Sequence, residues 1–345
     1  MGKAAIYNPY LDTLGGGERY TMSFAKVLAE DLGYEVFVQW HDKSISEKIS
    51  SRFGMKLPAS IKFVDSINRG ENYDLCFWVS DGSIPTLRAK KNYLHFQVPF
   101  RNVNGKSLIN KMKLFRINAI ICNSNFTAEV IKEEYGTSVV VVYPPIDVVS
   151  FKSKRKENMI IYVGRFSSLL QSKGQEILVD KFKDFYKQNN LKWKLVLVGG
   201  AEVGADNLID KLNKMKGKYP VEIIVSPTFT DLKNLVGRAK IFWSATGFGV
   251  DETKDPKRVE HFGMTLVEAM SAGCVPVVYS AGGHKEIIES SQNGFLWQNK
   301  KDLITLTNRL IKEKGLMVRM SGEAKKRAQK YDYETFRQQI LQIIK

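Results

Sequence analysis

The sequence predicts an α/β protein made of two domains, each with a parallel sheet between helices. The chain has 345 residues, more than one hydrophobic core normally spans. Short apolar runs alternate with longer amphipathic segments, which is typical of parallel strands joined by crossover helices. The Pro144-Pro145 pair interrupts this alternation and indicates a linker between two similar sets. Together these observations favour two Rossmann-like domains.

The apolar runs give the expected elements in order. The first helix is expected over ERYTMSFAKVLAEDL, from about Glu18. Strands of the first domain are expected at AAIYNPY, EVFVQW, IKFVD, DLCFWV, KNYLHF, AIICNS and SVVVVY. Strands of the second are expected at NMIIYVG, KWKLVLVGG, VEIIVS, AKIFWSA and CVPVVYS. YDYETFRQQILQIIK predicts a last amphipathic helix, so the expected division is 1–148, 149–328 and a terminal helix in 329–345.

Composition indicates an ordinary globular chain of the cytoplasm. Hydrophobic residues make up 43% and charged residues 26%. No apolar run approaches the roughly 18 residues that cross a bilayer, and the first residues lack the apolar core of a signal peptide. Cys76, Cys122 and Cys274 lie in apolar runs without metal-ligand spacing. We therefore expect buried thiols in a reducing compartment.

The segment EHFGMTLVEAMSAG, residues 260–273, carries the clearest chemical signal. Good helix formers follow Gly263, so a helix is expected from about Met264 to Gly273. Glu268 would lie in its first turns, and Glu260 in the loop before it. The first amides of a helix carry partial positive charge and have no partners within the helix. These amides can bind a phosphate, and the two carboxylates beside it can accept hydrogen bonds from sugar hydroxyls. Together they predict a binding site for a nucleotide sugar.

Further motifs follow in a fixed order along the chain. They are Gly15-Gly16-Gly17-Glu18, NYLHFQVPF around His95, CNSNFT at 122–127, YPPID at 143–147, and YVGR at 162–165 with Lys173-Gly174 downstream. With the two glutamates, this set resembles the retaining glycosyltransferases of family 4 (group 1). The opening NPYLDTLGGGERY is similar to mannosyltransferases that extend lipid-linked oligosaccharides.

The resemblance implies the GT-B fold, with two Rossmann-like domains facing a central cleft and the C-terminal helix crossing back to the first. It implies that Arg165 and Lys173 clamp the diphosphate, and that His95 and Glu260 hydrogen-bond the transferred sugar. We predict these four as the catalytic residues. The predicted donor-binding residues are Gly15, Gly16, Gly17, Arg165, Lys173, Phe229, Glu260, Phe262, Gly263, Met264, Thr265, Leu266 and Glu268.

Structural explanations remain open for each motif. The glycines can form a flexible turn, and a lone histidine beside a strand is often a core residue. Lys173 can be a solvated lysine, Glu268 a helix surface residue, and Glu260 a partner of the helix dipole. No metal-ligand motif in a supporting context emerges, so no metal and no cofactor beyond the donor are expected. Arg165, Lys173 and the helix amides can neutralise a diphosphate instead.

Charge is unevenly distributed along the chain. The net charge is +16, of which residues 1–150 carry +3 and the remainder +13. From Gly82 to Ala128 eight basic residues occur without an acidic one. Within it, SLINKMKLFRINAI interleaves apolar residues with cations, a pattern that suits an anionic membrane surface or a phosphorylated lipid. A solvated helix that packs on the sheet explains it equally. Nucleic acid is disfavoured because no aromatic-rich basic module is present.

The leading hypothesis is a retaining, metal-independent transferase of a hexose from a nucleotide-diphosphate sugar. GDP-mannose is the favoured donor and a UDP-sugar the next, with a glycan or lipid-linked glycan as acceptor. The expected location is cytoplasmic, with a peripheral position on the inner face of a membrane as an option. A GT-B nucleotide-sugar epimerase or hydrolase, and a non-catalytic nucleotide-sugar binder, are the alternatives.

Overall fold

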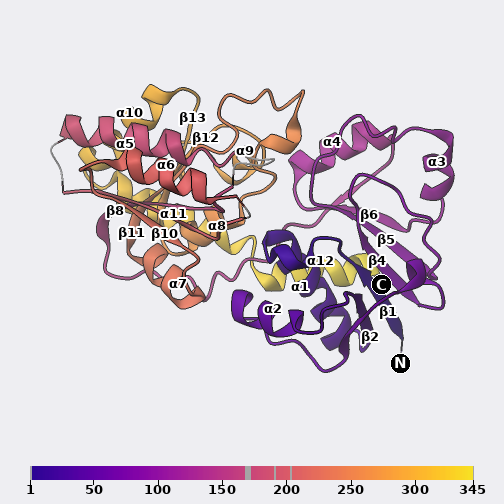
Figure 1. Cartoon of the computed structure of the whole chain (residues 1–345). Helices are drawn as coiled ribbons and strands as arrows, with labels where there is room; N and C mark the ends of the chain where they lie inside the picture. Colours follow the sequence, from indigo (N-terminus) through magenta and orange to yellow (C-terminus); the bar gives the residue numbers. More distant parts are fainter. Residues whose placement is uncertain (1, 168–171, 190–191, 203, 345) are drawn as a thin grey trace. The chain divides into compact units, whose positions relative to one another are not determined.

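The computed structural model describes residues 2–167, 172–189, 192–202 and 204–344. The chain divides into two compact units (Figure 1). Unit 1 comprises Met1–Pro145 and Tyr333–Lys345, and unit 2 comprises Ile146–Asp332. Each unit contains its own sheet, and all strand pairs in both sheets are parallel. The predicted fold class, two parallel-sheet α/β domains, is therefore confirmed.

Unit 1 is built on a seven-stranded sheet in the order β3-β2-β1-β4-β5-β6-β7. Its strands are β1 (Lys3–Tyr7), β2 (Glu35–Gln39), β3 (Ile61–Val64), β4 (Leu75–Val79), β5 (Lys91–Phe96), β6 (Ala119–Cys122) and β7 (Val140–Val141). Its helices are α1 (Gly16–Glu30), α2 (Ile45–Phe53), α3 (Leu108–Leu114), α4 (Asn125–Tyr135) and α12 (Tyr333–Ile344), with short 3-10 turns at Leu11–Thr13 and Asn68–Gly70. The strand order reverses between β1 and β4, as in a doubly wound sheet.

The C-terminal helix α12 belongs to unit 1, as the resemblance implied. Phe336, Ile340 and Ile344 recur every four residues, so they form one apolar face, which is buried in the core of this unit. Phe336 meets Tyr20 of α1 edge to face, with ring centroids 5.1 Å apart. Arg337 adds an ion pair to Asp31 at 2.6 Å. The chain thus returns to unit 1 after completing unit 2.

Unit 2 is built on a six-stranded sheet in the order β10-β9-β8-β11-β12-β13. Its strands are β8 (Glu157–Val163), β9 (Lys194–Gly199), β10 (Val221–Val225), β11 (Ala239–Ser244), β12 (Val275–Tyr279) and β13 (Phe295–Trp297). Its helices are α5 (Gln175–Asn189), α6 (Asp206–Lys216), α7 (Phe229–Arg238), α8 (Met264–Ser271), α9 (His284–Ile287), α10 (Lys300–Lys312) and α11 (Leu316–Gln329), with a 3-10 turn at Pro256–Arg258. The central strands are buried along nearly their whole length, which explains their continuous apolar sequences.

Two details differ from the sequence-based expectation. Helix α1 begins at Gly16, two residues before the expected Glu18, because Glu18 acts as a cap inside the first turn. Its carboxylate accepts hydrogen bonds from the Gly15 amide and the Thr13 hydroxyl, both at 2.8 Å. Strand β13 was not predicted, since a three-residue strand shows no periodicity.

Candidate donor site

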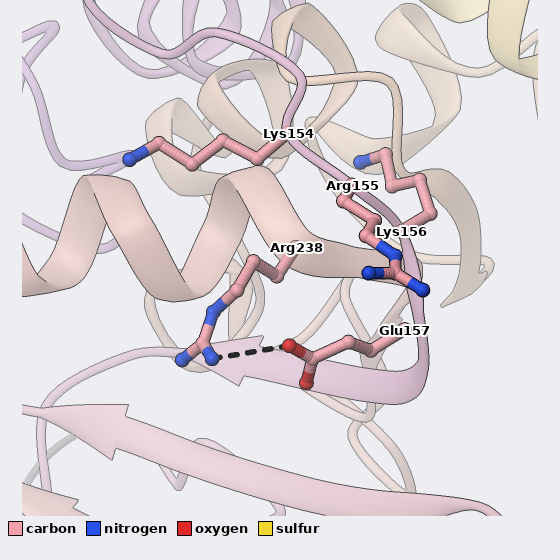
Figure 2. A pocket seen from close by; sticks show the side chains of 5 residues that line it. All are labelled: Lys154, Arg155, Lys156, Glu157 and Arg238. Carbon is pink, nitrogen blue, oxygen red and sulfur yellow. Dashed lines mark hydrogen bonds and ion pairs between the residues drawn. The ribbon is translucent and has the colours of Figure 1, made fainter.

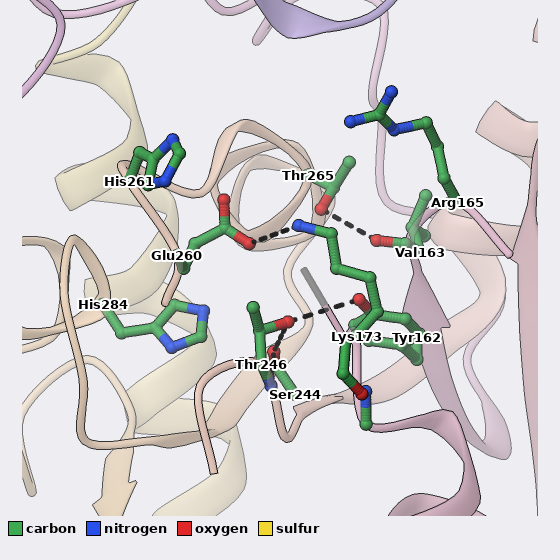
Figure 3. Close-up of polar contacts among 12 residues, drawn as sticks. Tyr162, Val163, Arg165, Lys173, Ser244, Thr246, Glu260, His261, Thr265 and His284 are labelled. Carbon is green, nitrogen blue, oxygen red and sulfur yellow. Dashed lines mark hydrogen bonds and ion pairs between the residues drawn. The ribbon is translucent and has the colours of Figure 1, made fainter. Parts of the chain in front are cut away.

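The candidate site lies at the carboxyl edge of the unit 2 sheet. Strand order reverses between β8 and β11, and open α/β sheets bind ligands outside the carboxyl ends of the strands at such a reversal. Here the Tyr162 hydroxyl at the end of β8 lies 3.4 Å from Oγ1 of Thr246, just after β11. Ser244 donates a hydrogen bond to the same Thr246 oxygen at 3.2 Å. These contacts join the two strand ends at the reversal point (Figure 3).

Helix α8 starts at this edge, at the residue that the sequence predicted. Gly263 precedes it with φ 116°, a left-handed conformation that side chains disfavour, and Gly273 follows its end with φ 77°. The Thr265 hydroxyl in the first turn donates to the Val163 carbonyl at 3.0 Å and so ties α8 to the end of β8. The first amides of α8 therefore lie beside the β8 terminus, where they can bind an anion.

Glu260 and Lys173 form the centre of the site. Their side chains come from loops 87 residues apart in sequence, yet Nζ of Lys173 donates to Oε2 of Glu260 at 3.2 Å (Figure 3). The two side chains are only 13% and 22% exposed. Burial by itself raises the pKa of Glu260, but Lys173, and after it His284 and His261, lower that pKa below its ordinary value. Glu260 is therefore an ionised hydrogen-bond acceptor at neutral pH.

Three residues that the sequence analysis missed hold Glu260 in place. Gly283 donates its amide to the Glu260 carbonyl at 2.7 Å, and a Cβ on Gly282 would lie 2.1 Å from that carbonyl oxygen. His284 is buried next to them, and its Nδ1 donates to the Tyr279 carbonyl at 2.9 Å. Burial lowers the pKa of His284, and the negative charge of Glu260 opposes this shift. The signal was the AGGH segment directly after the CVPVVYS strand.

Arg165 lies at the carboxyl end of β8 but is directed to a different carboxylate. Its Nη1 lies 2.5 Å from Oε1 of Glu202, and its side chain is 46% exposed. Its carbonyl accepts a hydrogen bond from Nε2 of Gln175 at 2.9 Å, which fixes the backbone at the start of α5. The structure therefore brings Lys173 and Glu260 together and pairs Arg165 with Glu202. The diphosphate role of Arg165 stays a prediction.

The other predicted donor residues of unit 2 fall into two groups. Glu268 is buried on α8, eight residues after Glu260 along the chain, and Met264, Thr265 and Leu266 form the first turn of that helix. Phe262 is buried against Tyr331, with ring centroids 5.3 Å apart, so its side chain serves packing. Phe229 begins α7 and is half-buried. Its ring lies 5.8 Å from that of Phe151 and under the ammonium of Lys233 at 4.6 Å.

The predicted site residues of unit 1 lie around the start of α1. Gly15 is the N-cap of the helix, and Gly16 and Gly17 form its first turn. A Cβ on Gly17 would lie 1.8 Å from Oε1 of Gln97, so the side chain of Gln97 occupies the space that this glycine leaves. A larger residue at position 17 would therefore force the flexible end of the Gln97 side chain to move.

His95 is fully buried at the end of β5. Its Nδ1 donates to the Ile121 carbonyl at 3.0 Å, and its ring stacks on Tyr20 with centroids 4.2 Å apart. Burial lowers the pKa of His95 to about 3, so the ring is neutral. Its Nε2 has no hydrogen-bond partner among the described residues. The predicted contact of His95 with a sugar hydroxyl remains a prediction, and in this structure the side chain does not reach the surface.

A basic pocket in unit 2 is a second concave feature. It has a volume of about 630 Å³ and is lined by Lys154, Arg155, Lys156, Glu157 and Arg238 (Figure 2). It lies at the amino end of β8, opposite the edge where α8 begins. Lys156 donates to the carbonyls of Ala239 and Ala272 at 2.6 and 2.7 Å, and Arg238 pairs with Glu157 at 3.1 Å. Two of its cations therefore have internal structural partners, and we do not assign the donor to it.

The three cysteines agree with the expectation of buried thiols. Cys76, Cys122 and Cys274 are free and buried, and burial raises the pKa of Cys76 and Cys122 to about 12. Within the described ranges, no cluster of three or more His, Cys, Asp or Glu residues could hold a metal ion. No described helix has the length and apolar character needed to cross a bilayer.

Two doubly wound α/β units, one with a helix N-terminus and a Lys–Glu ion pair at its strand reversal, define a protein of the GT-B fold class. The chain belongs to the family of glycosyl transferases group 1, whose model matches residues 145–327, more than half of the chain. The family match covers nearly all of unit 2, which is the unit that contains the candidate donor site.

Individual relatives agree with this assignment. The GDP-Man:Man(3)GlcNAc(2)-PP-Dol alpha-1,2-mannosyltransferase of Dictyostelium discoideum is 26% identical over 68% of this chain and 47% of its own length. Its counterpart in Xenopus tropicalis is 26% identical over 85% of this chain and 76% of its own. The Neurospora crassa counterpart is 25% identical, and the match covers 80% of this chain and 48% of that protein. The chain thus spans about half the length of the Dictyostelium and Neurospora proteins.

Solved structures support the fold. The crystal structure of Anabaena Alr3699/HepE in complex with UDP and glucose matches with a TM-score of 0.77 at 18% identity, over 100% of this chain and 99% of that one. Sucrose-phosphate synthase from Thermosynechococcus elongatus matches with a TM-score of 0.75 at 14% identity, over 100% and 98%. At these identities the likeness concerns the fold alone.

Proposed function

We propose that this protein is a retaining mannosyltransferase that transfers mannose from GDP-mannose to a lipid-linked glycan. The observation that carries the proposal is the Lys173–Glu260 pair beside the first turn of α8, at the strand reversal of unit 2. The names of the relatives from Dictyostelium, Neurospora and Xenopus favour the donor and the acceptor class. A UDP-sugar is the second candidate donor, because HepE has this fold and binds UDP and glucose.

The proposed chemistry uses the charges of the site in separate roles. The α8 amides, Lys173 and Arg165 neutralise the diphosphate as the bond between it and the sugar C1 breaks. Glu260 accepts hydrogen bonds from sugar hydroxyls, and Glu268 accepts them from the ribose. The acceptor hydroxyl oxygen bonds to C1 on the face that the diphosphate leaves, and its proton passes to the departing phosphate oxygen. This route retains the configuration at C1 and needs no protein base.

We also propose that the reaction proceeds without a divalent ion. Lys173 and Arg165 each bring a full positive charge to the carboxyl edge of β8, and a helix terminus adds about half of an elementary charge. The free, buried cysteines fit a reducing compartment, so we place the reaction in the cytoplasm.

Two experiments test the proposal. A thermal-shift panel of nucleotide sugars identifies the donor, since a ligand at 100 times its dissociation constant stabilises a protein by roughly 2.7 kcal/mol. GDP-mannose should give the largest shift. Incubation with GDP-mannose and a short-chain lipid-linked glycan should then release GDP and form an α-linked product, read by NMR of the anomeric proton. A β-linked product excludes the retaining mechanism.

The same incubation separates the alternatives. A nucleotide-sugar hydrolase or epimerase would consume the donor at the same rate with and without the glycan acceptor. A non-catalytic binder would show a thermal shift but no turnover with any acceptor. Glu260→Gln serves as the matched control for the proposed donor site. The substitution keeps the shape of the side chain and removes the negative charge that the site requires.

A further inference from the structure

Helix α3 of unit 1 exposes apolar side chains that a folded protein normally buries. Leu108, Ile109 and Met112 are 74%, 67% and 63% exposed, and Phe115, at the C-cap of the helix, is 90% exposed. None of the seven residues of α3 is buried. We call these four side chains the α3 apolar face. Figure 1 shows α3 at the periphery of its unit.

The spacing of these residues places them on one side of the helix. With 3.6 residues per turn, Leu108, Met112 and Phe115 lie within about 60° of one another, and Ile109 widens the arc to about 120°. Leu114 lies on the opposite side, half-buried against the core cluster that contains Phe96 and Ile120. The helix is therefore held by its Leu114 side and directs the α3 apolar face away from the core.

The α3 apolar face groups several exposed apolar side chains in one place, whereas the other exposed apolar side chains are scattered. Among the described residues, nine large apolar side chains are exposed, and four of them form the α3 apolar face. The other five come from separate elements: Tyr10, Val140, Val149, Val225 and Val318. Single exposed apolar residues are ordinary, whereas a contiguous group indicates an interaction surface.

Lysines without partners surround the face. Lys106, Lys111 and Lys113 make no side-chain hydrogen bond or ion pair with any residue that the structure describes. Arg116 differs, because its Nε donates to the Leu87 carbonyl at 2.9 Å and holds the chain after the helix. The segment from Gly82 to Ala128 contains no acidic residue that could neutralise these lysines locally.

Two acidic residues of α4 are engaged by the segment that leads into α3. On α4, Glu133 pairs with Arg101 at 2.8 Å. Glu134 accepts hydrogen bonds from three amides of the loop that leads into α3: Asn102 and Val103 at 3.0 Å, and Gly105 at 3.1 Å. The Ser107 hydroxyl then caps α3 by accepting from the Asn110 amide. The loop and helix are thus fixed in place, which lowers the entropy cost of docking on a surface.

We propose that the α3 apolar face docks on an anionic membrane surface. Leu108, Met112 and Phe115 would enter the boundary between headgroups and acyl chains, while the three lysines lie over anionic headgroups. An apolar arc flanked by unpaired cations suits this occupant, because a lipid bilayer provides both an apolar layer and negative charge. The inference is independent of the proposed function, since it rests on unit 1 surface residues and needs no donor or acceptor.

Vesicle sedimentation tests the proposal directly. The wild-type chain should bind phosphatidylcholine vesicles that contain phosphatidylserine much more strongly than phosphatidylcholine alone. This binding should weaken with salt, since charges are screened beyond about 8 Å at physiological ionic strength. Changing Lys106, Lys111 and Lys113 to Gln should weaken binding about a hundredfold, at roughly fivefold per lysine. Leu108→Ser/Met112→Ser/Phe115→Ser should weaken binding to a similar degree.

Matched controls are available on the same molecule. Lys187, Lys214 and Lys218 are exposed lysines of unit 2, and changing them to Gln removes the same charge from the half of the chain that carries +13. Val149→Ser/Val318→Ser removes exposed apolar surface elsewhere. Both controls should bind vesicles like wild type. Circular dichroism and the nucleotide thermal shift should be unchanged in all variants, because none of the altered side chains is buried.

Three outcomes would overturn the proposal. The first is equal sedimentation of the wild type with anionic and neutral vesicles at low salt. The second is undiminished binding of the α3 lysine variant while the unit 2 control loses binding, which would assign the attraction to unit 2. The third is a wild-type dimer in light scattering that the triple Ser variant converts to a monomer without any change in vesicle binding. In that case a second copy of the chain covers the face.

Discussion

The Lys173–Glu260 pair gives the most quantitative test of the site. At 3.2 Å and an effective dielectric constant of about 20, two unit charges attract by roughly 5 kcal/mol. Desolvation of both ions offsets several kcal/mol of this, which leaves a coupling energy of about 1–3 kcal/mol in a double-mutant cycle. Lys173→Met alone leaves a largely buried carboxylate without its main partner. We expect it to lower the unfolding free energy by about 2 kcal/mol, or roughly 4–8 °C in the melting temperature.

The dependence on pH gives an independent check. In the wild type the pKa of Glu260 lies below 4.5, so its stabilising contribution is present above pH 4.5 and is lost as pH falls through the folded pKa. Without Lys173 this pKa rises, because Lys173 is the largest of the charges that lower it. Protonation then relieves the unpaired charge, and the destabilisation by Lys173→Met should be smaller at pH 5 than at pH 8.

The assay is thermal or urea unfolding of the ligand-free wild type, Lys173→Met, Glu260→Gln and the double variant at both pH values. The control cycle uses Lys211 and Glu176, a pair at 2.8 Å whose side chains are 62% and 41% exposed. Exposed pairs of this kind couple by at most about 1 kcal/mol. A Lys173–Glu260 coupling no larger than that of the control, or an equal loss of stability at both pH values, would refute the reasoning.

Three further predictions concern catalysis and unit 1. Arg165→Ala should lower turnover about a hundredfold or more without changing the fold, since a group that stabilises a developing anion contributes roughly 2.7–4 kcal/mol. Initial-rate measurements near the wild-type value would exclude the diphosphate clamp. Transfer should survive excess EDTA, and activity that is lost in EDTA and restored by Mg²⁺ or Mn²⁺ would contradict the metal-independent proposal. Burial lowers the pKa of His95 to about 3. Below pH 6.5 the His95 ring therefore binds a proton in the unfolded chain but not in the native chain. The stability of unit 1 should therefore fall by up to about 1.4 kcal/mol per pH unit below 6.5. Urea unfolding of His95→Gln should lose this slope, whereas the exposed control His41→Gln should keep it; an unchanged slope in His95→Gln would show that the ring titrates normally.

Much of the fold was predictable because it depends on local patterns. Every strand expected from an apolar run is present, and helix α8 begins at Met264 as its sequence indicates. Strand β13 escaped prediction because FLW is too short to show a period. The start of α1 was misplaced because Glu18 caps the helix from within, a role that depends on a hydrogen bond and not on helix propensity.

The sequence by itself determined the two-domain α/β architecture and the family, since hydrophobic periodicity and the order of motifs are properties of the chain alone. It also indicated Lys173, Glu260 and Glu268 as members of one site. Only the tertiary structure decided the contacts among these residues. The order of parallel strands places the β8 and β12 loops at one edge, so Gly282, Gly283 and His284 support Glu260, and Arg165 meets Glu202. Such contacts join segments far apart in sequence, and burial at this edge also sets the charge state of each group. A linear pattern contains neither the strand order nor the burial.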